Sequence, residues 1–293
     1  MHAVFSKLLL RLCACLPLRF THLLGGLLGW ALFIFSRDLC NSSDTNLRLC
    51  LSQQSTAARV ALTRQSLIEM GKTITEMGPL WFWRRQRVLE KIKKISGKEH
   101  LDNAIAQGKG VLLALPHLGA WEMVGLYCSA NHPMTSLYRP PRMAALDSTV
   151  RHARERFGAT LVPTTTQGVR ALYRALGNGE LVAILPDQDP RDSGGLFVPF
   201  FGIPAYTMTL LARLAKKSSA PVIYSFAERL PRGEGFHLHF IPATWDATQN
   251  DIEQSTRQVN NGVEQCIMQC PEQYQWSYKR FRTRPAGEAS FYD

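Results

Sequence analysis

A histidine and a carboxylate in this sequence have the types and spacing of a general-base pair: His117 and Glu122, with four residues between them. Residues 110–115 read Gly-Val-Leu-Leu-Ala-Leu, a run typical of a buried strand, and Pro116 ends it because proline has no N–H to donate. We therefore expect His117 on the loop after this strand and Glu122 in the first turn of the next helix. There the carboxylate holds one ring nitrogen, fixes the tautomer and leaves the other nitrogen free to take a proton.

The sequence offers this pair no nucleophile of its own. It has no G-x-S-x-G elbow, and Cys128 lies further along the expected helix with no basic neighbour to activate its thiol. The hydroxyl that the base would activate therefore belongs to a substrate. The alternative is a structural histidine whose hydrogen bonds are simply satisfied.

The chain around the pair alternates between strands and helices. We expect strands at 92–95, 133–138, 160–162, 181–185, 222–227 and 236–240, and helices at 144–157, 168–176, 207–216 and 251–270. This alternation predicts an α/β fold with a mainly parallel sheet flanked by helices. Right-handed crossovers bring the strand ends to one edge, so His117, Arg139 and Asp187 are expected to converge there.

Further motifs follow His117 and Glu122 in order. They are Leu137-Tyr-Arg-Pro140, Arg154-Glu-Arg156, Leu185-Pro-Asp-Gln-Asp189, Phe197-Val-Pro-Phe-Phe-Gly202, Pro271-Glu-Gln-Tyr-Gln-Trp276 and Lys279-Arg-Phe-Arg-Thr-Arg-Pro285. The first pair is similar to the HX4D/E signature of the glycerolipid acyltransferase superfamily. Over essentially the whole chain the ordered set resembles one branch, the lipid A biosynthesis lauroyl/myristoyl acyltransferases.

This resemblance implies direct acyl transfer from acyl-acyl carrier protein to the 3-hydroxyl of an acyl chain on the lipid A precursor. In that reaction His117 is the general base and Glu122 orients it, and no cofactor is needed. The resemblance also implies the inner membrane as the location, with the catalytic domain facing the cytoplasm. Acyl carrier protein, the glycolipid precursor and the membrane are then the expected partners.

Basic and acidic side chains at the expected strand ends are candidates for binding the substrate. Arg139 follows a strand and suits a phosphate or an oxyanion, because a guanidinium is always charged. Arg154 and Arg156 are two apart on a helix, so at most one is expected to point into the site, and the resemblance favours Arg154. Asp187 is expected to orient arginines or sugar hydroxyls. Asp187 and Asp189 near glycines are also compatible with a metal loop, but no ligand cluster accompanies them and no metal is expected.

Two further segments carry predicted substrate contacts. Residues 194–207 are apolar but broken by Gly and Pro, so we expect a substrate-facing loop in which Phe200 and Gly202 border an acyl groove. The alternative is a loop that crosses the core. Lys279 and Arg280 belong to a cationic segment near Trp276 that suits a bisphosphorylated headgroup or an acidic carrier. A solvated surface rim is the alternative there.

Composition favours a membrane-surface enzyme. The net charge of +11 indicates an anionic partner, and the seven cysteines show no C-x-x-C pair. Residues 23–35 carry no charge and predict a membrane anchor; we favour a single span over a helix lying in the interface. No basic groove with stacking aromatics is evident, which argues against nucleic acid. The expected organisation is an anchor (1–37), a helical basic segment (38–100) and a catalytic domain (101–293).

Three other functions stay open at this point. The chain could acylate a lysophospholipid or another glycolipid, or use the same base on water as a thioesterase. It could also be a non-enzymatic binding protein for anionic lipids. Supplying acyl donor without acceptor separates the thioesterase, because only that enzyme releases free fatty acid.

Overall fold

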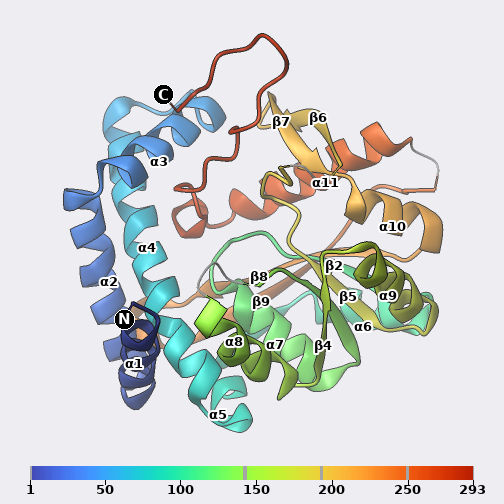
Figure 1. The fold of residues 1–293 in the computed structure, drawn as a ribbon, viewed down its shortest axis with the longest axis horizontal. Coiled ribbons are helices and arrows are strands. Elements are labelled where there is room, and N and C mark those ends of the chain that lie inside the picture. Colours follow the sequence, from blue (N-terminus) through green and yellow to red (C-terminus); the bar gives the residue numbers. More distant parts are fainter. Residues whose placement is uncertain (1, 141–143, 192–193, 249–250, 293) are drawn as a thin grey trace.

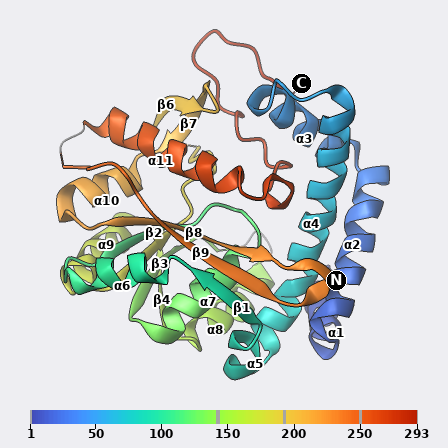
Figure 2. The same ribbon diagram turned by 180° about the vertical axis from the view of Figure 1, so that it is seen from behind.

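Seven strands form the central sheet in a computed structural model that describes residues 2–140, 144–191, 194–248 and 251–292 (Figure 1 and Figure 2). The strands are β1 (Ile92–Ser96), β2 (Val111–Ala114), β3 (Met134–Tyr138), β4 (Ala159–Pro163), β5 (Leu181–Ile184), β8 (Val222–Arg229) and β9 (Phe236–Pro242). Their order is β1-β9-β8-β2-β5-β3-β4, and all neighbours are parallel except β8 and β9. The predicted α/β class with a mainly parallel sheet is confirmed.

Helices cover both faces of this sheet, which explains why its middle strands are apolar throughout. On β2, Leu112 and Ala114 pack into one core cluster while Val111 and Leu113 pack into the other. The first cluster includes residues of α9 (Thr166–Gly177), α10 (Leu210–Ser218) and α11 (Ile252–Ile267), and the second includes residues of α6 (Lys98–Ala106), α7 (Trp121–Asn131) and α8 (Asp147–Glu155). A 3₁₀ turn, η1 (Ala144–Leu146), precedes α8.

The N-terminal helices stand as a separate layer beside the sheet, at the left of Figure 1. They are α1 (His2–Cys15), α2 (Leu18–Phe35), α3 (Arg37–Cys50), α4 (Thr56–Phe82) and the short α5 (Arg85–Leu89). Helices α2 and α4 touch through their backbones: a Cβ added to Gly71 would lie 2.0 Å from Gly25 O, and one added to Gly29 would lie 2.2 Å from Leu67 O. Only glycine permits this approach, so α2 is packed along α4.

The predicted substrate-facing loop at residues 194–207 is a β-hairpin, and the loop prediction was wrong. Strands β6 (Gly195–Phe200) and β7 (Ile203–Met208) pair in antiparallel register. Phe201 and Gly202 have φ of 49° and 79°, so both central turn residues are left-handed, as tight hairpins with right-handed strand twist require. The Gly and Pro residues that argued against a helix are equally compatible with such an edge hairpin.

The C-terminal segment runs from η3 (Pro271–Gln273) back across the top of the molecule to α3. Asn46 on α3 donates from Nδ2 to the carbonyl oxygens of Trp276 and Tyr278, at 2.6 and 2.7 Å. The hydroxyl of Tyr292 donates to Asn46 Oδ1 at 2.5 Å. The segment is thereby held between α3 and the sheet. The predicted three-part division at residues 37 and 100 stays a prediction.

Candidate functional site

His117 lies on the loop after β2, and its partner is Asp187, on the loop after the neighbouring strand β5. The imidazole Nδ1 lies 2.8 Å from Asp187 Oδ1, and the His117 backbone N–H donates to Asp187 Oδ2 over 2.9 Å. The predicted meeting of these two strand ends is confirmed. Asp187 is 1% exposed, whereas the His117 side chain is 16% exposed. Two bonds to one carboxylate fix both the position and the rotation of the ring.

The carboxylate of Asp187 is held in its ionised form. Burial opposes ionisation, but the charge of His117 and hydrogen bonds from its ring and backbone outweigh burial, and the pKa of Asp187 lies below its usual value. Tyr274 stands on the other side, where burial and then the nearby charge of Asp187 raise the pKa of its hydroxyl well above the usual range. An ionised Asp187 keeps the proton of the neutral imidazole on Nδ1 and leaves Nε2 as the basic nitrogen.

Glu122 does not orient His117, and that prediction was wrong. Its carboxylate accepts from Arg154 Nε and Nη2 at 2.9 and 2.8 Å, and from Trp81 Nε1 at 3.1 Å. Burial opposes ionisation of Glu122, but Arg154 and Trp81 outweigh it and lower the pKa of its carboxyl. Glu122 therefore ties the start of α7 to α8 through Arg154 and to α4 through Trp81. Arg154, predicted to contact substrate, uses two of its donors on this carboxylate.

The turn between His117 and α7 is built on glycine. Gly119 has φ of +58°, and a Cβ there would lie 2.1 Å from Ala227 O. The N–H of Gly119 donates to Gln273 O at 3.0 Å, and the N–H of Ala120 donates to Ala227 O at 2.7 Å. This loop is consequently fastened to both β8 and η3. A residue without a side chain is needed at Gly119 for that close approach.

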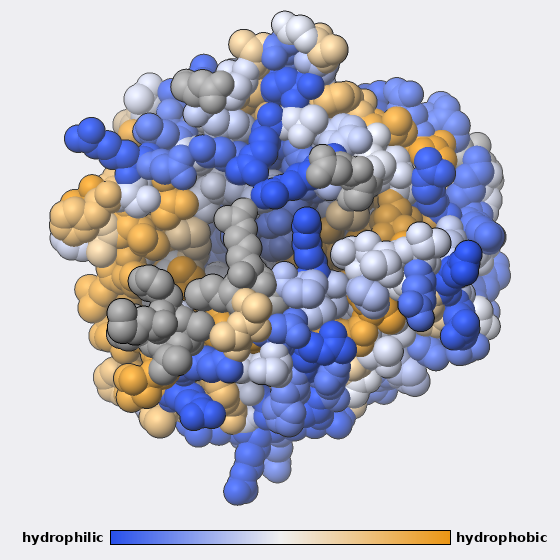
Figure 3. All heavy atoms as spheres, viewed as in Figure 1, coloured by the Kyte–Doolittle hydropathy of each residue, from blue (hydrophilic) through white to orange (hydrophobic). Residues whose placement is uncertain are grey.

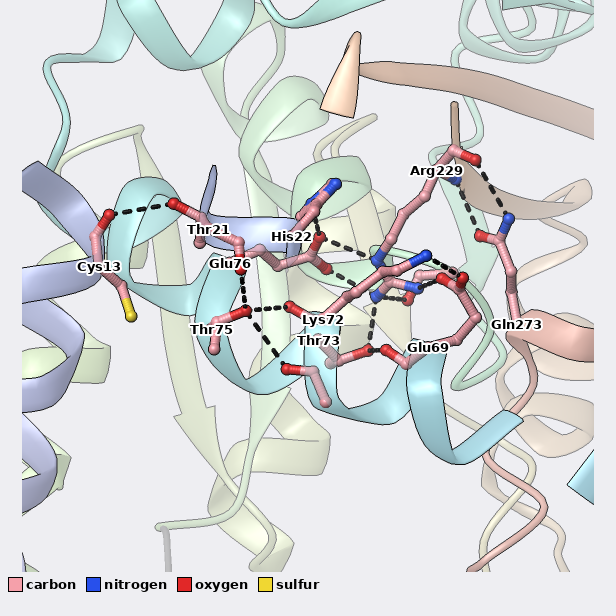
Figure 4. Close-up of polar contacts among 12 residues, drawn as sticks. Cys13, Thr21, His22, Glu69, Lys72, Thr73, Thr75, Glu76, Arg229 and Gln273 are labelled. Carbon is pink, nitrogen blue, oxygen red and sulfur yellow. Dashed lines mark hydrogen bonds and ion pairs between the residues drawn. The ribbon is translucent and has the colours of Figure 1, made fainter. Parts of the chain in front are cut away.

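A buried ionic network extends from this loop to the N-terminal helices (Figure 4). Arg229, at the end of β8, donates to Gly119 O at 2.9 Å and to both carboxylate oxygens of Glu76 at 2.8 and 2.6 Å. His22 Nε2 on α2 lies 3.0 Å from Glu76 Oε2. Burial opposes ionisation, but Arg229 and His22 lower the pKa of Glu76 to about 2. The network therefore links α2, α4, β8 and the His117 loop.

Aromatic and apolar side chains surround the exposed side of His117. The Trp121 ring lies 5.1 Å from the imidazole centroid, and the Gln275 N–H donates to His117 O at 3.2 Å. An apolar cavity of about 270 Å³, which we call the α4 groove, runs between α4 and residues 273–275. Its lining includes Met70, Ile74 and Met77, with Trp121 at its border with the histidine. A hydrocarbon chain in the α4 groove would therefore reach the neighbourhood of His117.

Arg139 and Arg156, two of the predicted substrate-binding arginines, differ from each other in their surroundings. Arg139 is exposed on the loop that follows β3. Arg156 donates from Nη1 to Trp83 O at 2.6 Å and from Nη2 to Leu80 O at 3.0 Å. Those carbonyls belong to the C-terminal end of α4, which lacks intrahelical donors. Arg156 is thus a capping residue of α4, and its assignment to substrate was wrong.

The remaining predicted contacts are mostly internal. Phe200 is 1% exposed and packs in the core, and Gly202 forms the hairpin turn described above. Arg280 is also buried: it donates to Tyr206 O at 2.7 Å and to Thr207 Oγ1 at 2.6 Å, which fastens the C-terminal segment to the hairpin. Phe200 and Arg280 are therefore internal packing and fastening residues, whereas Gly202 is exposed at the turn and its contact with substrate stays a prediction. Lys279 lies at the surface, where Nζ donates to Asp38 Oδ1 over 2.9 Å.

Three residues that sequence reasoning had not assigned to the site contribute to it: Trp121, Tyr274 and Gln275. Trp121 directly precedes Glu122, and the other two come from the 271–276 motif. The available signal was that all three residues lie within the motifs already identified. Only the fold, however, brings the C-terminal segment against the loop after β2. The Leu118 and Tyr274 backbones form an antiparallel bridge there.

Together these side chains hold an imidazole in a fixed orientation beside an apolar groove. Among the described residues, the His117 site has no cysteine or serine hydrogen-bonded to the imidazole, and its acids and histidine form no three-ligand metal cluster. The arrangement therefore suits proton removal from a substrate hydroxyl or from water.

Comparison with known proteins shows extensive similarity. A family model described as bacterial lipid A biosynthesis acyltransferase matches residues 3–283. The chain is 30% identical over 278 residues to the lipid A biosynthesis lauroyltransferase of Escherichia coli (strain K12), covering 94% of this chain and 90% of that protein. It is 31% identical over 251 residues to the palmitoleoyltransferase of that organism, covering 84% and 80%. Identity to its myristoyltransferase is 25% over 248 residues, covering 84% and 76%.

Proposed function

The chain belongs to the bacterial lipid A biosynthesis acyltransferase family, and from this membership we propose that it is a late acyltransferase of that pathway. It transfers a fatty acyl chain from acyl-acyl carrier protein to the 3-hydroxyl of an acyl chain already on the lipid A precursor. The observation that carries the mechanism is the pair of bonds between His117 and Asp187, which presents a basic nitrogen beside the α4 groove.

The proposed reaction uses that geometry. His117 Nε2 takes the proton of the acceptor hydroxyl, and the oxygen attacks the thioester carbonyl carbon of the donor. The tetrahedral intermediate collapses, the carbon–sulfur bond breaks, and the thiolate takes the proton back from the imidazolium. Asp187 stabilises the imidazolium while it exists. Acyl-enzyme is not formed, which agrees with a site whose nucleophile comes from the substrate.

The α4 groove is the proposed entry for hydrocarbon. It opens between α4 and the C-terminal segment and is lined mainly by apolar side chains up to Trp121. Acceptor lipid and donor thioester both carry acyl chains, and apolar lining removes such chains from water. Arg139 and Lys279, both at the surface, remain our proposed contacts for acceptor phosphates or acidic carrier.

We further propose that α1 and α2 lie in the membrane interface, rather than crossing the bilayer. Helix α2 is long and apolar enough to span, but one of its sides is packed along α4 and tied to Glu76 through His22. The other side exposes the large apolar residues Leu23, Leu24, Leu27, Trp30, Ile34 and Phe35. Figure 3 shows an extended orange area at the left, where the N-terminal helices lie. A helix with one apolar face free and the other face attached to the domain suits interfacial insertion.

Vesicle binding tests this placement. Leu23→Glu with Leu27→Glu should weaken partition into phosphatidylethanolamine and phosphatidylglycerol vesicles by at least about a hundredfold, because each leucine that inserts into the bilayer contributes roughly 1.5–3 kcal/mol. Met268→Glu is the matched control, since Met268 is 53% exposed but lies after α11, away from α2. Partition of the double variant equal to that of Met268→Glu would contradict the proposal.

Replacement of the base tests the reaction. His117→Ala should lower kcat by at least about a hundredfold, the usual scale for losing a general base, in an assay with acyl-acyl carrier protein and lipid A precursor. His152→Ala, which removes an exposed histidine of α8, is the control and should keep normal turnover. Near-normal turnover in His117→Ala would reject the mechanism. Release of free fatty acid without acceptor, at the rate of transfer, would instead identify a thioesterase.

A further inference from the structure

Three potential metal ligands meet on the hairpin formed by β8 and β9, outside the groups assigned to acyl transfer. They are Glu228, His237 and His239, and one ligand atom from each lies within 4.8 Å of the other two. Glu228 Oε2 lies 3.1 Å from His239 Nε2 and 3.5 Å from His237 Nδ1. Neighbouring ligands around a tetrahedral zinc ion are separated by about 3.4 Å, as bond lengths near 2.1 Å require.

The strand register places these side chains together without any loop rearrangement. Glu228 is directly opposite His237 in the antiparallel pair, and His239 is two residues further along the same strand. Side chains two apart on a strand share one face. All three therefore project from the same side of a hydrogen-bonded hairpin, which fixes their backbones.

Additional contacts orient the two imidazoles. His237 Nε2 lies 2.8 Å from Ser96 Oγ on β1, so the nitrogen facing Glu228 is Nδ1. The His239 ring is stacked on Phe226, with centroids 4.4 Å apart and planes 7° apart. The contact of His237 with Ser96 is of the kind found in metal sites, where a bound histidine characteristically donates its other N–H to an oxygen. The His237 side chain is 11% exposed and that of Glu228 is 35% exposed, so one side of the cluster is open to solvent.

We infer that Glu228, His237 and His239 form a binding site for a divalent transition metal ion, and that Zn²⁺ is the ion whose coordination preferences they match. Two imidazoles and one carboxylate supply three zinc ligands and leave the fourth tetrahedral position for water. His237 coordinates through Nδ1 while its Nε2–H donates to Ser96 Oγ. His239 coordinates through Nε2, the nitrogen that faces Glu228.

The site adjoins the catalytic loop without using its residues. Glu228 stands between Ala227, which accepts from the Ala120 N–H, and Arg229, which donates to Gly119 O. One positive group opposes the metal: Lys94 on β1 is paired with His237 in the sheet register, and its charge disfavours a second cation nearby. Removing this lysine should accordingly strengthen binding.

No metal was expected from the sequence, because Asp187 and Asp189 have no ligand cluster beside them. Here the two histidines are only two residues apart, on a strand rather than a helix, and the carboxylate comes from the preceding strand. Only the antiparallel register of β8 and β9 brings them together.

Calorimetric titration of the full-length chain tests the site, with any histidine tag removed and the protein stripped with chelator. Zinc chloride alone should bind at one equivalent with micromolar or lower Kd, and should raise the Tm by about 5 °C at a hundredfold excess over Kd. His237→Ala, His239→Ala and Glu228→Gln should each weaken binding at least about a hundredfold, whereas His152→Ala should bind normally and Lys94→Gln more tightly.

Cobalt(II) provides a second readout that excludes the free cysteines. The expected visible spectrum is that of tetrahedral nitrogen and oxygen ligation without a thiolate charge-transfer band, and it should disappear in Glu228→Gln. Thiolate bands, or one equivalent of zinc retained by both Glu228→Gln and His239→Ala, would overturn the assignment. No zinc binding by the wild-type chain would overturn it equally. The inference does not depend on the acyl-transfer proposal, because binding is measured without substrate.

Discussion

Asp187→Asn should lower kcat by about a thousandfold to ten-thousandfold while leaving KM and Tm nearly unchanged. In the native protein Asp187 accepts two N–H groups, one from the His117 backbone and one from its ring. An asparagine has a single carbonyl oxygen. The backbone N–H cannot change its protonation, so the oxygen turns to it and the amide NH₂ faces Nδ1.

That exchange reverses the tautomer of His117. Nδ1 must then accept, the ring proton moves to Nε2, and the nitrogen that faces the substrate is no longer basic. The comparable exchange in a serine-protease triad costs about four orders of magnitude in kcat. Steady-state kinetics against donor and acceptor separately, with thermal unfolding on the same samples, provide the measurement. The double variant with His117→Ala should be no slower than His117→Ala alone, because the two residues act as a unit.

Glu122→Gln is the matched control, because it neutralises another buried acid, at the start of the helix that follows the His117 loop. Its partners are Arg154 and Trp81, so its loss frees a guanidinium rather than changing a tautomer. We expect a lower Tm and a higher KM there, with the pH dependence of kcat retained. If Asp187→Asn showed that same pattern and a normal kcat, Asp187 would be a structural residue and our mechanism would be wrong.

The sequence allowed the edge of the sheet to be predicted but not the partners along it. The run at 110–115 predicts a strand that ends just before His117, and the motif at 185–189 follows another strand. Because crossovers between parallel strands are right-handed, these observations were enough to place His117 and Asp187 at one edge of the sheet. Choosing Glu122 as the partner relied on proximity in sequence. In the structure, Arg154 from a later helix provides that carboxylate with two charge-assisted hydrogen bonds, which sequence spacing does not reveal.

The apolar hairpin at residues 194–207 shows a second limit of prediction from sequence. Proline and glycine at 194–207 excluded a helix correctly, but they do not distinguish an open loop from an edge hairpin with a tight turn. Arg280 was assigned to substrate because it belongs to a cationic segment near Trp276. Its burial depends on carbonyl and hydroxyl acceptors from Tyr206 and Thr207, more than seventy residues earlier. Long-range acceptors of this kind become visible only when the fold is known.

The buried network in Figure 4 leads to the largest expected change in stability, a loss of about 3–5 kcal/mol in Glu76→Gln. Arg229 and Glu76 are both buried and share two short hydrogen bonds. A glutamine cannot balance the guanidinium, which would remain charged in a dry environment. Thermal unfolding should show a Tm lower by about 10 °C. Glu69→Gln is the control: Glu69 also reaches Arg229, but over 3.4 Å and from a more exposed position, so the loss should be below about 1 kcal/mol.

The pH dependence distinguishes this electrostatic cause from a packing defect. The pKa of Glu76 is lowered from 4.5 to about 2 in the folded protein, so its ionisation stabilises the fold above pH 4.5. That contribution disappears as the pH falls from about 4.5 to about 2, where the native carboxylate also becomes protonated. The Tm difference between the native chain and Glu76→Gln should therefore shrink on acidification through this range. A difference that stayed constant from pH 7 to pH 3 would show that the substitution disturbs packing between α2 and α4, and that the charge of Glu76 contributes little to holding α2 against α4 and β8.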